Sequence, residues 1–182
     1  MSAKVESIVP IPSDSGKGTS IPNKWVFWYL IPCKGGQNVH WSEYLHPLHS
    51  FDTIEGFCKL LNSIEHLHSL LKGCRYYVFR EGVKPLWEDP SVKDGSVVSI
   101  EMEKIPENTE NIEQQWQDII IPTLNEELGP DVVGVEFASR ESSWRMASWV
   151  KKDSKNIEKI FEFYQNALPN LSNLVTVSKV GN

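Results

Sequence analysis

Residues 24–31 form the run KWVFWYLI, and no other feature of this sequence limits the possible fold as much. The run is apolar and aromatic, and its residues favour extended backbone. Pro32 ends it, because proline cannot donate to a hydrogen-bonded ladder. A short apolar run bounded by a turn signal is typical of a strand that is buried on much of both faces. We therefore predict a buried strand over these residues.

The period of the apolar residues predicts the other elements. Strands are expected at residues 75–80, 96–102, 131–138, 144–151 and 174–180, and helices at about 52–67, from 108 or 109 onward, and at about 154–168. Because strands and helices do not alternate strictly, a parallel sheet of βαβ units is disfavoured. The predicted fold class is α+β, with an antiparallel sheet that carries its helices on one face.

Two local signals refine the helices. Asp52, with Glu55 three residues later, forms a capping-box pattern, and the first helix is expected to reach about Leu67. In the second helix, Pro122 is expected to kink or end the first part, because proline removes a backbone donor.

Size and charge narrow the class of protein. A chain of 182 residues suits one domain, so we predict a flexible N-terminal arm over residues 1–20 and a single domain over residues 21–182. A net charge of −6 disfavours binding nucleic acid through a broad basic face. Any binding of nucleic acid then has to be local and centred on a base.

Cysteine usage and hydropathy indicate the compartment. Cys33, Cys58 and Cys74 form no CxxC pair, so we expect free thiols in a reducing compartment and no zinc site. No apolar run is long enough to span a bilayer, so no membrane association is expected. The predicted location is the cytoplasm, with the nucleus as a further site.

Two of the seven tryptophans lie in polar loops. A Trp taken alone is most often a core residue, and that interpretation stays open here. Trp41 and Trp87 nevertheless lie outside any apolar period, and two indoles can hold a flat cationic base between them. Glu88 can accept hydrogen bonds from the ring N–H and the exocyclic amine of guanine, a pair of donors that adenine lacks. Methylation of the guanine imidazole ring supplies the positive charge.

Two arginines are candidates for phosphate groups next to such a base. Arg145 shares a strand face with Trp149, four residues away, which separates them by roughly 13 Å at ~3.3 Å per residue. That spacing suits a base at one end and phosphates at the other. Arg140, in the preceding turn, can add a bidentate contact. The ordinary alternative for both is a solvated protein surface.

The order of these features resembles the translation initiation factor 4E family over roughly residues 21–180. The resemblance is carried by NKWVFW at 23–28, FDTIEGF at 51–57, GCRYYVFREGVKPLWED at 73–89 and Trp149. It implies a curved antiparallel sheet of about eight strands, with three helices packed on the convex face.

The resemblance also implies roles for individual residues in binding the 7-methylguanosine 5′ cap of mRNA. In the family, the positions of Trp41 and Trp87 stack the base and the position of Glu88 binds the guanine edge. The position of Trp149 contacts the methyl group, and the positions of Arg140 and Arg145 bind phosphates. Capped mRNA is thus the expected partner, in translation initiation or its regulation.

This chain departs from the family at two basic positions of the phosphate site. Ser142 and Val97 stand where the family has basic residues. We therefore expect phosphate binding that is weaker or rearranged.

A further departure lies on the surface for protein partners, which the resemblance places at Ile54, Cys58, Asp118 and Ile121. The family has a Trp at the position of Cys58, and loss of a large apolar anchor weakens an interface. The expected partner is a scaffold protein of the 4G type, or another helical peptide, and we expect Tyr-x-x-x-x-Leu peptides to bind weakly. Apart from that partner, a monomer is expected.

Two other classes of function are alternatives to cap binding. The first is a protein-interaction module that kept the fold, does not bind caps and acts as a scaffold or competitor. The second is an enzyme that hydrolyses caps, which requires a cluster of metal-binding carboxylates. Glu88 and Asp89 are too few to form such a cluster, so we expect a protein that is not an enzyme and that binds no cofactor and no metal ion.

Overall fold

A computed structural model describes residues 18–32 and 40–181, with only the backbone of Trp41. The described residues form a seven-stranded, wholly antiparallel, curved sheet in the order β2-β1-β3-β5-β6-β4-β7. The strands are β1 (Ser20–Leu30), β2 (Leu45–Thr53), β3 (Arg75–Arg80), β4 (Ser96–Glu103), β5 (Val132–Ser139), β6 (Ser143–Val150) and β7 (Val175–Lys179). The α+β class is confirmed, with seven strands in place of about eight.

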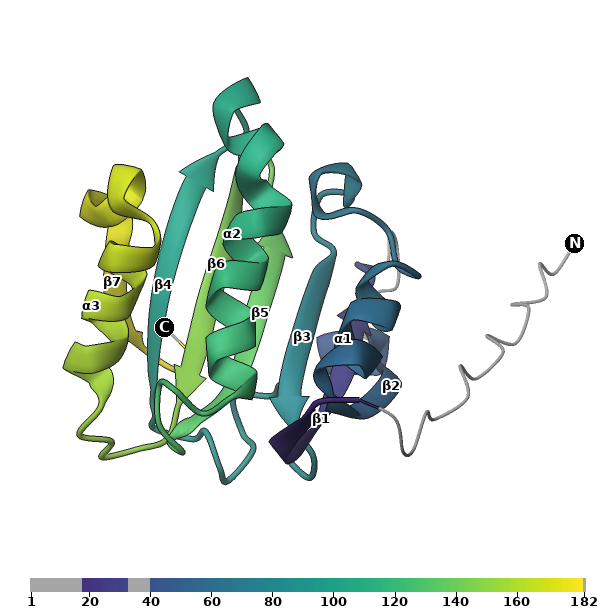
Figure 1. Cartoon of the computed structure of the whole chain (residues 1–182), viewed down its shortest axis with the longest axis vertical. Coiled ribbons are helices and arrows are strands. Elements are labelled where there is room, and N and C mark those ends of the chain that lie inside the picture. Colours follow the sequence, from purple (N-terminus) through teal and green to yellow (C-terminus); the bar gives the residue numbers. More distant parts are fainter. Residues whose placement is uncertain (1–17, 33–39, 182) are drawn as a thin grey trace, which may run out of the picture.

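Three α-helices cover one face of this sheet (Figure 1). They are α1 (Ile54–Leu61), α2 (Pro106–Leu124) and α3 (Ile157–Ala167), and the shorter 3-10 helices are η1 (Trp41–Tyr44), η2 (Leu67–Ser69) and η3 (Pro169–Leu174). Helix α1 contacts β2, α2 contacts β1 and β5, and α3 contacts β4 and β7. The prediction of helices packed on a single face is therefore confirmed. None of the helices in the described ranges has the length and apolar character needed to cross a bilayer.

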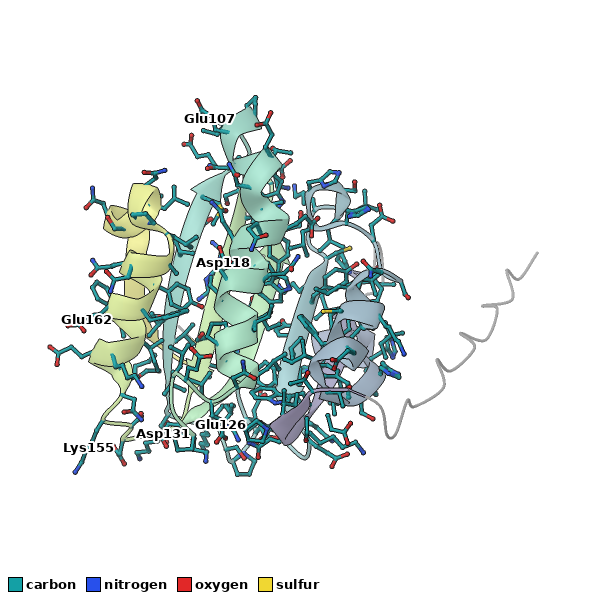
Figure 2. All side chains as sticks on the ribbon, in the orientation of Figure 1. Glu107, Asp118, Glu126, Asp131, Lys155 and Glu162 are labelled. Carbon is teal, nitrogen blue, oxygen red and sulfur yellow. The ribbon has the colours of Figure 1, made fainter. Side chains whose placement is uncertain are left out.

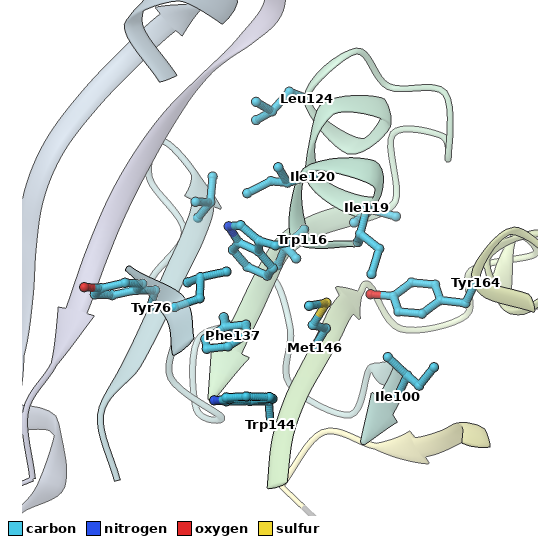
Figure 3. Close-up of a cluster of buried hydrophobic side chains, with 14 of the residues drawn as sticks. Tyr76, Ile100, Trp116, Ile119, Ile120, Leu124, Phe137, Trp144, Met146 and Tyr164 are labelled. Carbon is cyan, nitrogen blue, oxygen red and sulfur yellow. The ribbon is translucent and has the colours of Figure 1, made fainter. Parts of the chain in front are cut away.

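The main core lies between the helices and the sheet (Figure 3). Trp116 of α2 meets the Phe137 ring of β5 edge-on at 5.6 Å between centroids, and Ile120 lies next to Trp116 on the same helix. Burying each large apolar side chain contributes roughly 1.5–3 kcal/mol, so this layer supplies most of the stability. A second buried cluster lies on the other side of the sheet and draws its residues from strands and from the loop at 81–95. We call that side the open face.

Strand β6 supplies both clusters by alternation. Trp144 and Met146 lie in the helix-side core, whereas Ala147 and Trp149 lie in the cluster on the open face. The alternation expected from the sequence is thus confirmed.

The first helix differs from the prediction at both ends. Its N-cap is Thr53, whose hydroxyl accepts a hydrogen bond from the Gly56 N–H at 3.1 Å, and not Asp52. The Glu55 carboxylate does not close a capping box; it accepts hydrogen bonds from the backbone N–H and the hydroxyl of Thr19, at 2.6 and 3.0 Å. The helix ends at Leu61, several residues before 67.

The second helix begins earlier than predicted and is not ended by Pro122. It starts at Pro106, a residue type suited to the first turn, and runs on to Leu124. Pro122 lies within the last turn and has no backbone N–H to donate to the carbonyl of Asp118, four residues earlier. Because Asp118 is exposed, water can satisfy that carbonyl instead.

Some predictions concern residues outside the described ranges, and the predicted domain boundary is not tested by the structure. The arm at 1–17 and Cys33 are outside them. Ser20 already belongs to β1, and the domain boundary stays a prediction. In the described part, Cys58 is an exposed free thiol and Cys74 is a buried one.

Candidate functional site

The loop at 81–95, between β3 and β4, carries Trp87 to the open face. The Asp89 carboxylate closes it by accepting hydrogen bonds from the backbone N–H groups of Lys84 at 3.0 Å and Ser91 at 2.9 Å. Leu86 packs into the cluster on the open face, which anchors the loop beside Trp87. The Trp87 side chain is 47% exposed, whereas most other described tryptophans are buried. Glu88 follows it and is exposed.

Two hollows of the open face border Trp87. One, of about 240 Å³, is lined by Leu30, Gly73, Arg75, Tyr77 and Trp87. The other, of about 160 Å³, is lined by Arg75, Trp87, Val97, Glu136, Arg140, Arg145, Trp149, Ser178, Lys179 and Gly181. The structure therefore brings together four of the residues singled out from the sequence: Trp87, Arg140, Arg145 and Trp149.

Glu136 of β5 lies at the base of the smaller hollow and is only 1% exposed. Its Oε1 accepts a hydrogen bond from Arg75 Nη1 at 3.1 Å. Its Oε2 accepts hydrogen bonds from Arg145 Nη1 at 3.3 Å and from the Trp149 indole N–H at 3.0 Å. Burying a carboxylate is costly unless it is paired and hydrogen-bonded, and these three donors meet that requirement.

Sequence reasoning missed both Glu136 and Arg75. The available signal was a single carboxylate inside the otherwise apolar strand VVGVEFAS, which implies a buried partner of opposite charge. Burial lowers the pKa of Arg75, but the neighbouring Glu136 charge and Tyr77 raise it, and the net direction is upward. For Tyr77, burial disfavours the charged phenolate and raises the pKa, and the negative charge of Glu136 raises it further.

Trp149 is more enclosed than its expected contact with a ligand methyl group suggests. Its side chain is 4% exposed, and it meets Phe79 edge-on at 5.4 Å and Tyr77 edge-on at 6.4 Å between ring centroids. From ~3.3 Å per residue, the sequence predicted that Arg145 and Trp149 act roughly 13 Å apart. That prediction is wrong for their functional groups, because the Arg145 guanidinium and the Trp149 indole N–H both donate to the same oxygen of Glu136. A long arginine side chain can lean along the strand, which the residue spacing alone ignores.

The two arginines expected to bind phosphate already have carboxylate partners. Arg140 Nη1 lies 2.7 Å from Glu101 Oε2, and both side chains are nearly half exposed. Arg145 is more buried, at 16% exposed, and pairs with Glu136. A phosphate ligand has to share or displace these partners.

Trp41 is the first residue of η1. Its side chain lies outside the described part of the chain, so a stack between Trp41 and Trp87 stays a prediction.

The residues expected to contact a protein partner lie on α1 and α2, on the opposite side of the sheet. Ile54 and Ile121 are partly buried against the main core, and Cys58 is exposed. Asp118 points outward from α2 (Figure 2) and accepts a hydrogen bond from Gln114 at 2.8 Å.

Comparison with known proteins gives one consistent family. The profile of the family described as eukaryotic initiation factor 4E matches residues 20–178. Eukaryotic translation initiation factor 4E-3 of Caenorhabditis elegans is 28% identical over 141 residues, which are 75% of this chain and 55% of that protein. Eukaryotic translation initiation factor 4E-1 of Hordeum vulgare is 28% identical over 142 residues, 77% of this chain and 64% of that protein. The chain thus spans 55–64% of the length of these two relatives.

Solved structures share the fold. A structure of Ascaris suum eIF4E-3 with an m2,2,7G cap has a TM-score of 0.80 at 22% identity and covers 91% of this chain and 93% of its own. A complex of Caenorhabditis elegans eIF4E-3 with the 4E-binding protein Mextli and a cap analogue has a TM-score of 0.78 at 23% identity. The match covers 90% of this chain and 93% of that chain.

Proposed function

This chain belongs to the eukaryotic initiation factor 4E family, and on that premise we propose that it binds the 7-methylguanosine 5′ cap of mRNA in translation initiation or its regulation. The observation that carries the proposal is the exposed Trp87 ring beside a hollow lined by Trp149, Arg140 and Arg145. Relatives of the same fold have been solved with caps, which supports the same ligand here.

In the proposed complex, Trp87 and Trp41 stack on either side of the methylated base. Stacking on an aromatic side chain contributes roughly 1–3 kcal/mol per base, and the positive charge of the base adds cation–π attraction. Glu88 accepts hydrogen bonds from the guanine edge, which contribute about 1.5–3 kcal/mol each because the acceptor is charged. Arg140 and Arg145 contact the phosphates, and Trp149 forms the wall next to the methyl group.

On the helix-covered side, we propose that an amphipathic helix of a scaffold protein docks on Ile54, Cys58, Asp118 and Ile121. The Caenorhabditis elegans eIF4E-3 complex with Mextli supports a protein partner of this kind. A protein with these partners acts in the cytoplasm, and we propose the nucleus as a second location. The proposed role is binding, without catalysis.

A second candidate is the interaction module that kept the fold and does not bind caps. One observation favours it: Arg140 and Arg145 are both engaged by carboxylates, and Trp149 is nearly enclosed. These features lower the expected affinity for a capped ligand.

Intrinsic Trp fluorescence separates the two candidates. We expect 7-methylguanosine triphosphate to quench the emission strongly and guanosine triphosphate to quench it weakly, because only the methylated base is cationic. Absent quenching by both nucleotides would favour the interaction module, and equal quenching by both would contradict selective recognition of the methylated base.

Substitution of Trp87 tests the stack directly. Trp87→Ala should weaken binding to 7-methylguanosine triphosphate by roughly 5-fold to 150-fold, which corresponds to losing one stacked ring. Trp87→Phe, which keeps a smaller ring, should retain part of the affinity. Equal retention of wild type and Trp87→Ala on immobilised 7-methylguanosine triphosphate, with unchanged thermal melting, contradicts the proposed stack.

A further inference from the structure

Arg75 lies in the wall of both hollows beside Trp87, although neither apolar periodicity nor family resemblance singled it out. It is the first residue of β3 and pairs in register with Ala138 of β5. Arg145 of β6 pairs with the same Ala138 from the other side. The two arginines therefore flank one small residue, two inter-strand spacings or ~10 Å apart at their Cα atoms.

Glu136 lies two residues from Ala138 on β5, so it shares the same face of the sheet. It takes one hydrogen bond from each guanidinium, at 3.1 Å from Arg75 and 3.3 Å from Arg145. These contacts draw both side chains toward a common centre and fix their orientation. Glu136 is thus a positioning residue, since it is too buried to meet a ligand itself.

The charges in this cluster do not cancel. Two guanidinium groups face one carboxylate, which leaves a net charge of +1 next to the smaller hollow. Each guanidinium has five N–H donors, and Glu136 engages one nitrogen of each. The Arg75 side chain is 39% exposed and that of Arg145 is 16% exposed, so donors of both remain accessible from the hollow. Lys179 lines the same hollow and adds a further positive charge.

We propose that Arg75 and Arg145, oriented by Glu136, form a two-guanidinium clamp for the phosphate groups of the ligand. Planar guanidinium groups bind phosphate oxygens in pairs, and groups already held in place lose less freedom when they do so. Val97 lines the same hollow without a charge, and Arg75 supplies one from the neighbouring wall. The clamp rests on the proposed function and deepens it by naming a further ligand-binding residue.

The test measures how affinity depends on the number of phosphates. Dissociation constants are determined by Trp fluorescence for 7-methylguanosine, its monophosphate and its triphosphate, with wild type, Arg75→Gln and Arg145→Gln. Lys59→Gln on α1 is the matched control, because it removes one positive charge on the opposite side of the sheet. Wild type and Lys59→Gln should bind more tightly as phosphates are added.

Arg75→Gln should weaken triphosphate binding by about 10-fold to 100-fold, the effect of losing a charge-assisted hydrogen bond. Binding of the nucleoside should change by less than about twofold, because 7-methylguanosine carries no phosphate for Arg75 to contact. An equal loss for nucleoside and triphosphate would mean that Arg75 acts only through the structure, and it overturns the clamp. No loss for the triphosphate overturns it as well.

Arg75→Lys keeps the test decisive if Arg75→Gln does not fold. Lysine keeps the charge next to Glu136 but lacks the planar fork, so triphosphate affinity should fall to an intermediate value. Wild-type affinity for the triphosphate in Arg75→Lys overturns the paired guanidinium geometry.

The unmethylated nucleotides separate this proposal from the proposed function. If guanosine triphosphate binds as well as its methylated form, and Arg75→Gln weakens both, the clamp stands and cap recognition fails. If the methylated base is preferred but added phosphates bring no gain, cap recognition stands and the clamp fails. If wild type binds none of these nucleotides, both fail.

Discussion

At the scale of single residues, Glu136 determines how the open face is built. Three donors from the two neighbouring strands, β3 and β6, meet on its carboxylate, so the positions of Arg75, Arg145 and Trp149 depend on one side chain. Alternation along β6 predicted the face of Trp149, because alternation needs only the strand itself. The convergence on Glu136 depends on the register between β3, β5 and β6, which a single sequence does not encode locally.

Loss of Glu136 should therefore be costly. Glu136→Ala leaves two partly exposed cations without their common partner, so the loss should approach but not exceed the about 3–5 kcal/mol that removing one member of a fully buried ion pair costs. Urea denaturation measures the change in the free energy of unfolding. Glu101→Ala, which removes the exposed pair with Arg140 and the hydrogen bond from the Ser143 hydroxyl, is the control and should cost less, about 1–2 kcal/mol. Equal losses for the two variants would show that burial of Glu136 contributes nothing.

At the scale of elements, the loop at 81–95 was the part of the site that could be predicted from sequence. A Trp outside any apolar period, followed by two carboxylates, already indicated a functional loop. Strand β2 was missed, because LHPLHSFDT contains Pro47 and two histidines and lacks a run of strand-favouring residues. Proline is tolerated there because β2 is an edge strand, which only the assembled sheet reveals.

The loop should depend on Asp89. Asp89→Ala removes two hydrogen bonds to the backbone N–H groups of Lys84 and Ser91, so the loop loses the geometry that presents Trp87. We expect faster hydrogen exchange at the amides of 84–91 and weaker binding of 7-methylguanosine triphosphate, by roughly tenfold for the loss of one or two such bonds. Asp89→Asn keeps one acceptor oxygen and should lie between wild type and alanine. Unchanged exchange in Asp89→Ala would rule out this role.

At the scale of the whole molecule, the sheet separates two surfaces. Helices α1, α2 and α3 cover one face (Figure 1), and Trp87 with its neighbouring hollows lies on the other. The amphipathic period of the helices predicted this layering well, since burying three apolar stripes on one side requires it. Because a rigid, closely packed layer lies between the surfaces, changes on one should leave binding on the other almost unaffected.

Cys58 provides the test of this separation. Cys58→Trp adds a large apolar side chain to the exposed surface of α1, where it can serve as an anchor for an amphipathic helix. Calorimetry with a Tyr-x-x-x-x-Leu peptide should show weak binding to wild type and a gain of about tenfold or more in the variant, the effect expected of a central aromatic anchor. The affinity for 7-methylguanosine triphosphate should stay within about twofold, because the two sites share no contacts. Cys58→Ala controls for loss of the thiol: it should leave the affinity for 7-methylguanosine triphosphate as it is and bring no gain in peptide affinity. Tight binding of the peptide by wild type would show that α1 and α2 already form a complete interface without an aromatic residue at position 58.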